Sequence, residues 1–394
     1  MITQTHEFQK EYQEFLEEVY NNLTELQVPQ KATIAVGLSG GVDSASTLAI
    51  LRELGYNTIA VTMKIWNPKY EHLITTNGKL HGCFGPEEIQ DIQDIKLITQ
   101  KLKTPLYVID LSEEYDQTIL SYFKREYLLG RTPNPCVMCN WKMKFEYLLE
   151  GLKQLKVEFD YFATGHYVKR TIFQNYHTLS KAKYIQKDQT YYLSFLNQNH
   201  IKKSIFPLGL IKSKDLTRQI AQKYDLPVYN KPDSQNFIST KYIEIFKGVE
   251  IKDGIIQHKN GKILGKHKGI HLYTIGQRKG LNISYPNPLY VINIDSQTNT
   301  ITVGEKEDLY QSKLIAKNPN WIVPFQELPP NTQILGKIRY THQENPCSVK
   351  LNSGNTLEVE FTEKQMAITP GQIIAFYVDQ TLIGSAIIEK IILS

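Results

Sequence analysis

A glycine-rich loop between a short strand and a helix constrains this chain more than any other feature of its sequence. Residues 33–38 form an apolar run with β-branched side chains, and the sequence SGGVDS follows directly at 39–44. The two glycines let the backbone approach a ligand closely, and their N–H groups, with the start of the helix, form a site for an anion such as phosphate. Asp43 would repel phosphate, so we expect it either to act through a bridging Mg²⁺ or to start the helix.

Strand and helix patterns alternate over the first half of the chain. Apolar runs at 58–63, 106–110 and 161–164 are separated by segments of helical periodicity at 43–54, 86–103 and 113–129. Such alternation predicts a parallel sheet covered by helices on both faces. Ligands of these sheets bind beyond the carboxyl ends of the strands, where the glycine loop would lie.

Hydrophobic spacing and turn signals along the chain predict four regions. Apolar residues spaced three and four apart predict an amphipathic helix over 7–26. Beyond residue 230, turn signals and short alternating runs predict mainly β structure, with a second domain boundary near residue 304. We therefore expect a helical extension at 1–30, an α/β nucleotide-binding domain at 31–230, a β-rich domain at 231–303 and a β-barrel-like domain at 304–394.

Composition limits the class of protein more than its partners. The 394 residues are 41% hydrophobic and 22% charged, as in an ordinary globular protein. No apolar run approaches the ~18 residues that a membrane helix needs, and the N-terminus lacks the pattern of a signal peptide. Four cysteines in so long a chain argue against a disulfide framework and for the reducing cytoplasm. The net charge of +5 is compatible with nucleic-acid binding without demonstrating it.

The loop sequence itself resembles a known phosphate-binding motif. Ser-Gly-Gly-x-Asp-Ser after a first strand is similar to the pyrophosphate loop, or PP-loop, of N-type ATP pyrophosphatases. Those enzymes split ATP between the α and β phosphates and adenylate a carbonyl oxygen, so the resemblance implies ATP and Mg²⁺. Synthetases for GMP, NAD, arginine and asparagine precursors share the loop with tRNA-thiolating enzymes, so the loop alone leaves the substrate open.

Two cysteines lie close together in a proline-rich segment. Residues 131–140 read RTPNPCVMCN, and the two prolines predict an extended, irregular loop. Cys136 and Cys139 have the spacing of shared metal ligands or of a redox pair. An inert buried pair is less expected, because cysteines are scarce here and the segment is polar.

This segment resembles the Thr-Pro-Asn-Pro-x-x-x-Cys-Asn motif of the tRNA-specific 2-thiouridylases, the MnmA/TrmU family. Other blocks of that family occur in the same order after residue 31, at 37–44, 63–66, 130–140, 163–167, 187–193, 231–235, 273–281, 339–340 and 369–372. Each block is weak alone, but their joint order is specific.

The resemblance implies a reaction on the wobble uridine, U34, of tRNA. ATP adenylates O2 of the base, a sulfur nucleophile attacks C2, and AMP leaves. Thiolate sulfur is nucleophilic at neutral pH where water is not, and the base must be turned out of its stack to react. A sulfur donor, either a cysteine desulfurase or a sulfur carrier protein, is also implied.

The resemblance assigns two sets of binding residues. ATP binding falls to Gly37, Leu38, Ser39, Gly40, Gly41, Val42, Asp43, Ser44, Met63 and Gly165. Contacts with tRNA fall to Asn134, Pro135, Cys136, His166, Lys187, Asp188, Gln189, Arg339, Tyr340 and Gln372. Lysine suits an RNA phosphate, and an arginine beside a tyrosine suits a splayed base. A lone histidine is more often structural, and Asp188 is also a capping residue type.

Two departures from the family concern the sulfur chemistry. Most members have an aspartate, interpreted as a general base, at the position of Cys136, and many have a second catalytic cysteine after the Asp-Ser-Gln segment, which is absent here. Cys83 precedes a helix, whose N-terminus lowers a thiol pKa. We hypothesise that Cys83, Cys136 and Cys139 converge as catalytic thiols. They would either ligate a [4Fe–4S] cluster with one open iron or run a persulfide cycle with Cys139 as nucleophile; a soft ligand at 136 favours the cluster.

Two alternative functions stay open at the level of sequence. One is another adenylating ligase, or amidotransferase, that uses glutamine-derived ammonia. The other is a non-catalytic RNA-binding protein in which the three cysteines and a histidine such as His81 hold structural zinc. Release of pyrophosphate only in the presence of tRNA would exclude the second alternative. Cys347, in the C-terminal region, is interpreted as incidental.

Overall fold

The computed structural model describes residues 6–73, 82–233, 236–238 and 242–392. The chain forms two compact units, which do not follow the order of the sequence. Residues 1–116, 136–241 and 380–382 make the first unit, and residues 117–135, 242–379 and 383–394 make the second. The segment 117–135 thus packs with the second unit, although it lies within the range 31–230 that the sequence assigns to one domain.

The first unit is built on a parallel sheet. Its strands run in the order β4-β2-β1-β5-β8, and every neighbouring pair is parallel. The strands are β1 (Thr33–Gly37), β2 (Asn57–Lys64), β4 (Leu106–Asp110), β5 (Tyr161–Ala163) and β8 (Ser204–Ile205). The helices and turns are α1 (His6–Glu25), α2 (Val42–Glu53), η1 (Pro68–Leu73), α3 (Glu88–Lys101), α4 (Ser112–Tyr115), α6 (Pro135–Met138), η3 (Cys139–Tyr147), α7 (Leu148–Gln154), η4 (Ile185–Lys187), η5 (Thr190–Leu193), α8 (Gln198–Lys202), η6 (Pro207–Leu210) and α9 (Lys214–Lys223).

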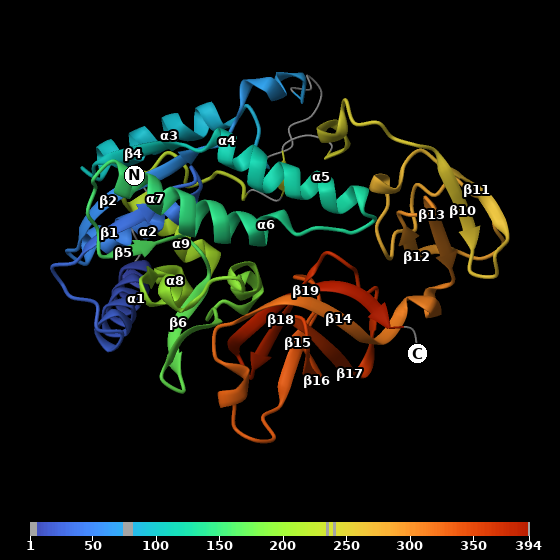
Figure 1. Cartoon of the computed structure of the whole chain (residues 1–394). Helices are drawn as coiled ribbons and strands as arrows, with labels where there is room; N and C mark the ends of the chain where they lie inside the picture. The colour runs from blue at the N-terminus through green and yellow to red at the C-terminus, as the bar shows by residue number, and fades with distance from the viewer. Residues whose placement is uncertain (1–5, 74–81, 234–235, 239–241, 393–394) are drawn as a thin grey trace. The chain divides into compact units, whose positions relative to one another are not determined.

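Helices cover both faces of this sheet, as Figure 1 shows. On one face Ile34 and Val36 of β1 join a core that includes α1, α2, α3 and α9. On the other face Phe162 of β5 meets Phe145 of η3 with ring centroids 5.2 Å apart. The alternation of buried side chains along each strand therefore feeds two cores, and the α/β class predicted from the sequence is confirmed.

Two smaller β elements complete the first unit. The hairpin β6 (Val168–Phe173) and β7 (Tyr176–Lys181) is antiparallel. A short parallel pair joins β3 (Gly82–Phe84) to β9 (Asn236–Ile238). The β3–β9 pair brings together segments that are far apart in the chain, and β3 contains Cys83, a predicted site residue.

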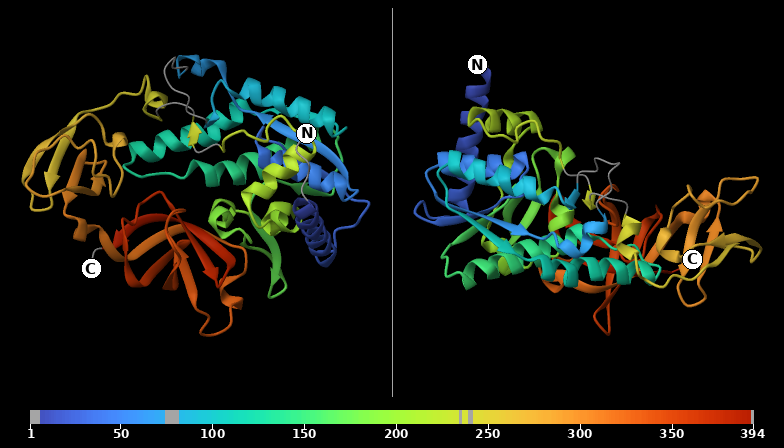
Figure 2. Two further views of the ribbon diagram at one scale, coloured as in Figure 1. Left: turned by 180° about the vertical axis from the view of Figure 1, so that it is seen from behind. Right: turned by 90° about the horizontal axis from the view of Figure 1, so that it is seen from above.

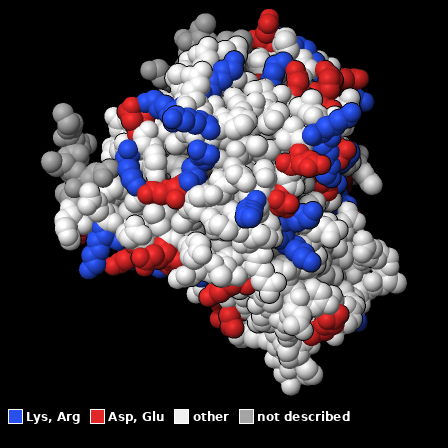
Figure 3. All heavy atoms as spheres, turned by 90° about the vertical axis from the view of Figure 1, so that its left-hand side faces the viewer, with Lys and Arg blue, Asp and Glu red and all other residues white. Residues whose placement is uncertain are grey.

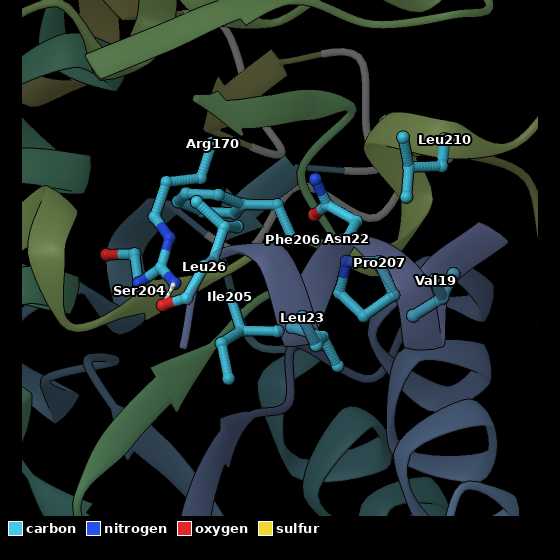
Figure 4. Close-up of a pocket in the computed structure, with 10 residues that line it drawn as sticks. All are labelled: Val19, Asn22, Leu23, Leu26, Arg170, Ser204, Ile205, Phe206, Pro207 and Leu210. Atoms are coloured by element: carbon cyan, nitrogen blue, oxygen red, sulfur yellow. Dashed lines mark hydrogen bonds between the residues drawn. The ribbon is translucent and has the colours of Figure 1, made fainter. Parts of the chain in front are cut away.

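The helix predicted over 7–26 is α1, and its apolar stripe is buried on the first unit. A small pocket lies under it, lined by α1, Arg170 and residues of β8 and η6 (Figure 4). Arg170 donates to the carbonyl of Leu26 at 3.3 Å across this pocket. The lining contains no predicted site residue, so we attribute the pocket to the docking of α1.

The second unit holds two β bodies. The first is a four-stranded sheet in the order β11-β10-β13-β12, made of β10 (Gly254–His258), β11 (Ile263–His267), β12 (Tyr290–Asp295) and β13 (Thr300–Gly304). Its core includes Ile256, Val291 and Ile301, each fully buried. The unit also contains η2 (Asp116–Leu120), α5 (Ser121–Leu128), η7 (Tyr242–Phe246), η8 (Ile270–Leu272), η9 (Lys306–Leu309) and η10 (Phe325–Glu327).

The second body is a closed barrel of six strands, seen from two further directions in Figure 2. Its strands are β14 (Tyr310–Trp321), β15 (Ile334–Lys337), β16 (Asn345–Asn352), β17 (Thr356–Met366), β18 (Ile373–Val378) and β19 (Thr381–Ile392). Their order is β14-β17-β16-β15-β18-β19, and pairing of β14 with β19 closes the ring. Closure removes exposed sheet edges, and the predicted barrel-like C-terminal domain is confirmed.

Candidate active site

The phosphate loop is closed by its own hydroxyl groups. Ser44 donates from Oγ to the carbonyl of Gly41 at 3.1 Å and accepts from the backbone N–H of Ser39 at 3.1 Å. Gly40 has φ +71°, a conformation that glycine adopts without strain. Ser44 is buried and holds the loop, whereas Ser39 is exposed and its hydroxyl lies 3.3 Å from that of Ser44.

The other predicted ATP residues lie at the same edge of the sheet. Gly37 ends β1 opposite Val61 of β2, and Met63 lies two residues further along β2. Gly165 follows β5 and packs directly on the loop, because a Cβ there would lie 2.7 Å from the backbone of Asp43 and Ser44. The carboxyl ends of β1, β2 and β5 therefore surround the loop, as expected for a nucleotide site in a parallel sheet.

Asp43 is held by two side chains from other elements. The hydroxyl of Tyr167 donates to Oδ1 at 2.7 Å. The ammonium of Lys214, at the start of α9, lies 2.6 Å from Oδ1 and 2.7 Å from Oδ2. The carboxylate is thus fixed at the start of α2, with about a third of its surface exposed.

The cysteine pair lies on a helix and not in the loop that the sequence predicts. The irregular segment ends at Asn134, and Pro135 begins α6. Proline suits the first helical position because its missing N–H has no partner there in any case. Cys136 and Cys139 are therefore one helical turn apart and share a face, and Cys139 opens the π-helical segment η3. Such wide turns occur often at functional sites.

Cys83 lies on strand β3, beside the segment that follows Asp233. Gly82 and Phe84 pair with Asn236 and Ile238 of β9 in parallel register. Cys83 is exposed, and all four cysteines of the chain are thiols.

Burial keeps the paired thiols protonated. Burial, followed by the neighbouring thiols Cys83 and Cys139, raises the pKa of Cys136 to about 12. Burial raises the pKa of Cys139 to about 11, and the charge of Lys144 works against it. A helix start by itself lowers a thiol pKa, but for this pair desolvation outweighs that effect.

The three cysteines lie around one buried tyrosine. Burial raises the pKa of Tyr115, and the charges of Cys139, Cys83 and Cys136 raise it further. The ring of Tyr115 stacks on Phe84 with centroids 5.2 Å apart. The predicted thiols are thus near one another in the structure, although they come from two distant segments.

The thiols do not lie as metal ligands. Within the described ranges, no three histidine, cysteine, aspartate or glutamate side chains are placed to hold one metal ion. His81, the fourth ligand of the zinc alternative, lies outside the described residues. We therefore derive no reaction step through a metal at the cysteines.

Three family profiles cover the chain in order. Residues 32–240 match the tRNA methyl transferase HUP domain, residues 242–305 the tRNA methyl transferase PRC-barrel domain, and residues 311–388 the aminomethyltransferase beta-barrel domain. The chain is 42% identical over 362 residues to the tRNA-specific 2-thiouridylase MnmA of Endomicrobium trichonymphae, covering 90% of this chain and 98% of that one.

The chain belongs to the tRNA-specific 2-thiouridylase (MnmA) family. The MnmA of Caldicellulosiruptor saccharolyticus agrees, at 41% identity over 369 residues, 91% of this chain and 99% of that one. The chain is accordingly an enzyme of tRNA modification, and its family uses ATP. The alternatives of a different ligase and of a non-catalytic RNA-binding protein are set aside.

A solved structure of lower similarity contains a [4Fe-4S] cluster. The U34-tRNA thiolase NcsA from Methanococcus maripaludis with its [4Fe-4S] cluster is 20% identical, with a TM-score of 0.37 over 61% of this chain and 72% of that one. A likeness so slight carries no argument about the cysteines of this enzyme.

Within the second unit, several MnmA-type blocks hold the segment before the cysteines. Gln372 donates to the carbonyls of Thr132 and Pro133 at 2.9 and 3.0 Å. The hydroxyls of Thr132 and Thr274 lie 2.5 Å apart, and the N–H of Thr132 donates to the carbonyl of Pro370 at 2.8 Å. Gln372, predicted to contact tRNA, therefore fixes the backbone that leads to Asn134.

Arg339 has a similar internal role. Its guanidinium donates to the carbonyl of Ile275 at 3.1 Å and to the hydroxyl of Thr369. It thus joins two of the family blocks within the second unit. Tyr340, the predicted stacking partner, is half-buried, and the ammonium of Lys337 lies 6.0 Å from its ring centroid.

The first-unit residues predicted to contact tRNA divide into buried and exposed groups. His166 is buried and bonds Thr164 at 2.7 Å, and burial holds its pKa well below the usual value. The ring is thus enclosed in this structure, and its contact with tRNA stays a prediction. Asp188 is also buried and accepts from Ala182 N–H and Thr190 Oγ1, which makes it a structural acceptor.

Gln189 and Lys187 complete this group. Gln189 accepts from the backbone N–H of Tyr167 at 2.9 Å, which helps to place the tyrosine that holds Asp43. Lys187 is more exposed, with its ammonium 2.8 Å from Oδ2 of Asp233. Among Lys187, Asp188 and Gln189, Lys187 has the positive charge that suits an RNA phosphate.

Sequence reasoning missed two lysines at the site. Lys214 comes from α9, and Lys144 comes from η3, five residues after Cys139. Phe145 and His166 both pack against Phe206 at 6.4 Å, so η3 lies beside the loop after β5. The charge of Lys144 lowers the pKa of Cys136, Cys139 and His166. The Met-Lys-Phe stretch after the cysteines was the only signal in the sequence.

Neither the helices nor the surface charge identifies a further binding region. Among the described helices, none is long and apolar enough to cross a membrane. On the face shown in Figure 3, Lys and Arg are interspersed with Asp and Glu, so the net positive charge is not gathered there into one basic patch.

Proposed function

We propose that this enzyme adenylates O2 of uridine 34 in tRNA with ATP and then replaces that oxygen with sulfur, releasing pyrophosphate and AMP. tRNA 2-thiouridylase activity is established by family. The observation that carries the mechanism is the phosphate loop of residues 39–44, closed by Ser44 at the carboxyl edge of the sheet.

In the first step, O2 of the base attacks the α-phosphorus of ATP. The bond from that phosphorus to the bridging oxygen breaks, and pyrophosphate leaves with the electron pair. The N–H groups of residues 39–41 and the start of α2 suit the phosphates, and Asp43 would hold a Mg²⁺ that neutralises part of their charge. Gly37, Met63 and Gly165 would line the nucleotide at the ends of their strands.

In the second step, we assign Cys139 as the sulfur nucleophile, carrying a persulfide. Its terminal sulfur attacks C2, and the C2–O2 bond breaks with AMP as the leaving group. A second thiol then attacks the sulfur of Cys139, which releases 2-thiouridine and leaves a disulfide. A dithiol reductant must reduce that disulfide before the next turnover.

Cys83 is the favoured second thiol. It is exposed, so a donor protein can reach it, and its strand pairs with β9, next to the segment after Asp233. Its neighbourhood with Cys136 and Cys139 is supported by their mutual effect on pKa. Cys136 replaces the usual aspartate, and with a pKa near 12 it is a poor base at neutral pH.

The partners follow from these assignments. We propose tRNA with uridine at position 34 as substrate, bound by Asn134, Pro135, Lys187 and Tyr340, and a cysteine desulfurase or sulfur carrier as donor. The first unit would carry out adenylation and the second would supply surface for tRNA. The thiol state of all four cysteines suits a cytoplasmic location.

Thiolation of a U34 tRNA in vitro tests this function. The purified enzyme with ATP, Mg²⁺ and a persulfide donor should form 2-thiouridine, measured by mass spectrometry of nucleosides, and should release pyrophosphate only when tRNA is present. Absence of both products would refute the proposal. Iron in anaerobically purified protein, lost with Cys139→Ala, would replace the persulfide cycle with the cluster route.

A further inference from the structure

The phosphate loop lacks a lysine of its own, and the fold supplies one from elsewhere. Ser213 caps α9 by accepting from the N–H of Leu216 at 3.1 Å, which fixes Lys214 at the first helical position. Lys214 lies 171 residues beyond Asp43 in the chain, yet its ammonium bonds both carboxylate oxygens of Asp43. A cation therefore stands at the start of α2, next to the loop.

Lys214 is held from a second side. Its ammonium lies 2.8 Å from Oδ1 of Asp233, whose other oxygen lies 2.8 Å from the ammonium of Lys187. The ring of Tyr167 lies 5.6 Å from the same ammonium. These four side chains form a row in which negative and positive charges alternate. The charges of the two lysines and the two aspartates therefore sum to zero.

The side chain of Lys214 is also more buried than that of the neighbouring Lys187. Only 12% of its side chain is exposed, compared with 39% for Lys187. A buried ammonium is costly unless it is paired, and removal of its partners would leave an uncompensated charge. The arrangement therefore keeps a largely desolvated cation beside the loop, where its attraction for an anion is stronger than in water.

We propose that Lys214 stabilises the pyrophosphate that leaves during adenylation, with Asp233 as the residue that positions it. The inference rests on the proposed adenylation at this loop. As the bond to the α-phosphorus breaks, the electron pair moves to the bridging oxygen, and the ammonium of Lys214 donates a hydrogen bond to the developing charge. The lysine keeps its proton. Lys187, tied to the same Asp233, lies at the outer end of the chain of charges.

A purely structural role predicts something different. If Lys214 only fixed Asp43 and the loop, its loss would weaken AMP and pyrophosphate alike. If it binds the leaving group, its loss weakens pyrophosphate selectively, because AMP lacks the phosphates that the ammonium contacts. The two products therefore separate the two roles.

Calorimetric binding of AMP and of pyrophosphate to the full-length enzyme, both without Mg²⁺ so that a metal at Asp43 affects neither affinity, is the test. We expect Lys214→Met to weaken pyrophosphate at least about tenfold, the loss of one charge-assisted contact, and AMP less than about twofold. Lys214→Arg should restore part of the loss, and Asp233→Asn should weaken pyrophosphate by a smaller factor. Lys223→Met is the matched control on the same helix, because Lys223 pairs with Glu53 at 2.7 Å instead.

Equal weakening of both products in Lys214→Met, or no change in either, overturns the inference. If Lys214→Met is poorly folded, the charge-preserving Lys214→Arg and the Asp233→Asn variant decide, and unchanged pyrophosphate binding in Asp233→Asn counts against positioning. Failure here is distinct from failure of the proposed function, because wild-type thiolation and tRNA-dependent release of pyrophosphate test that function directly.

Discussion

The phosphate loop and the cysteine site differ in how the chain builds them. The loop is one continuous stretch, a strand followed by four residues (38–41) and a helix, and Ser44 closes it locally. The cysteine site combines β3 with the turn from α6 to η3, more than fifty residues later. Local chemistry defines the first site, whereas the second exists only once the sheet has formed.

The two sites also differ in their charges. At the loop, Asp43 is matched by Lys214, so binding an anion disturbs a balanced set of ion pairs. At the cysteines, burial raises the thiol pKa values to about 12 and about 11, and Lys144 is the cation that opposes this. An anion at the loop therefore meets a cation that is already paired. The thiols, in contrast, must lose a proton against their raised pKa before they become nucleophiles.

The largest expected effect separates the two sites completely. Cys139→Ser should reduce formation of 2-thiouridine by at least about a thousandfold, because a hydroxyl cannot carry the sulfur. Release of pyrophosphate in the first turnover with tRNA should stay within about twofold, since the loop is intact. Both products are measured in the same assay. Cys347→Ala, in strand β16, is the control and should leave both rates unchanged.

A substitution at the loop should do the opposite. Gly165→Ala places a Cβ 2.7 Å from the backbone of Asp43 and Ser44, which cannot move aside as a side chain can. Pyrophosphate release should fall about a hundredfold as the loop shifts, with a loss of stability of about 1–3 kcal/mol. Persulfide uptake by the cysteines, followed by mass spectrometry, should persist.

Gly261→Ala provides the matched control for that substitution. Gly261 has φ +88°, and nothing lies within 4 Å of the position that an alanine methyl group would take. Only the backbone penalty of about 1 kcal/mol should appear, with full activity. If Gly165→Ala behaves like Gly261→Ala, the close packing of Gly165 on the loop is irrelevant to catalysis.

The pH dependence of thiol reactivity should expose the charge difference. With the pKa of Cys139 raised to about 11, its thiolate is scarce at neutral pH and grows as the pH rises. Alkylation of Cys139 by iodoacetamide should therefore accelerate roughly tenfold per pH unit between about pH 7 and 10, followed by peptide mass spectrometry. A plateau already at pH 7 would show that the thiol pKa is not raised.

Lys144→Met should slow this alkylation further, because the cation that favours the thiolate is gone. Lys142→Met is the control two residues away, where the ammonium pairs with Glu146 at 2.9 Å and covers the ring of Trp141. We expect the pH profile to move upward for Lys144→Met and not to move for Lys142→Met. Equal profiles would remove Lys144 from the site.

The smallest effect concerns the anchor of the segment before the cysteines. Gln372→Ala removes donors to the carbonyls of Thr132 and Pro133 and should cost about 1–3 kcal/mol in the free energy of unfolding, measured in urea. The exposed Gln297→Ala should change that free energy by less than about 0.5 kcal/mol. Similar values for both would mean that the two hydrogen bonds contribute nothing.

The fold and the loop were predictable because their signals are local. The strand–loop–helix run at 33–54 and the alternation after it specify a parallel sheet, and the sheet places the loop. The contribution of Lys214 was not predictable, since 171 residues separate it from Asp43 and only the packing of α9 on α2 brings them together.

The expected irregular loop at the cysteines was wrong, and the burial around the cysteines and His166 was not predictable from the sequence. The two prolines suggested an irregular loop, but Pro135 starts a helix and turns Cys136 and Cys139 onto one face. The sequence motif around His166 suggested a ring that faces RNA. Burial, which no short motif encodes, raises the pKa of both thiols and encloses that ring.

The central claim is that Cys83 belongs to the sulfur site and takes no part in adenylation. Formation of 2-thiouridine and release of pyrophosphate by Cys83→Ala, measured together against the wild type, test it most directly. In a single turnover we expect at least about a tenfold loss of 2-thiouridine, with pyrophosphate release nearly unchanged. Full thiolation by Cys83→Ala would contradict it and leave Cys136 and Cys139 as the whole of the site.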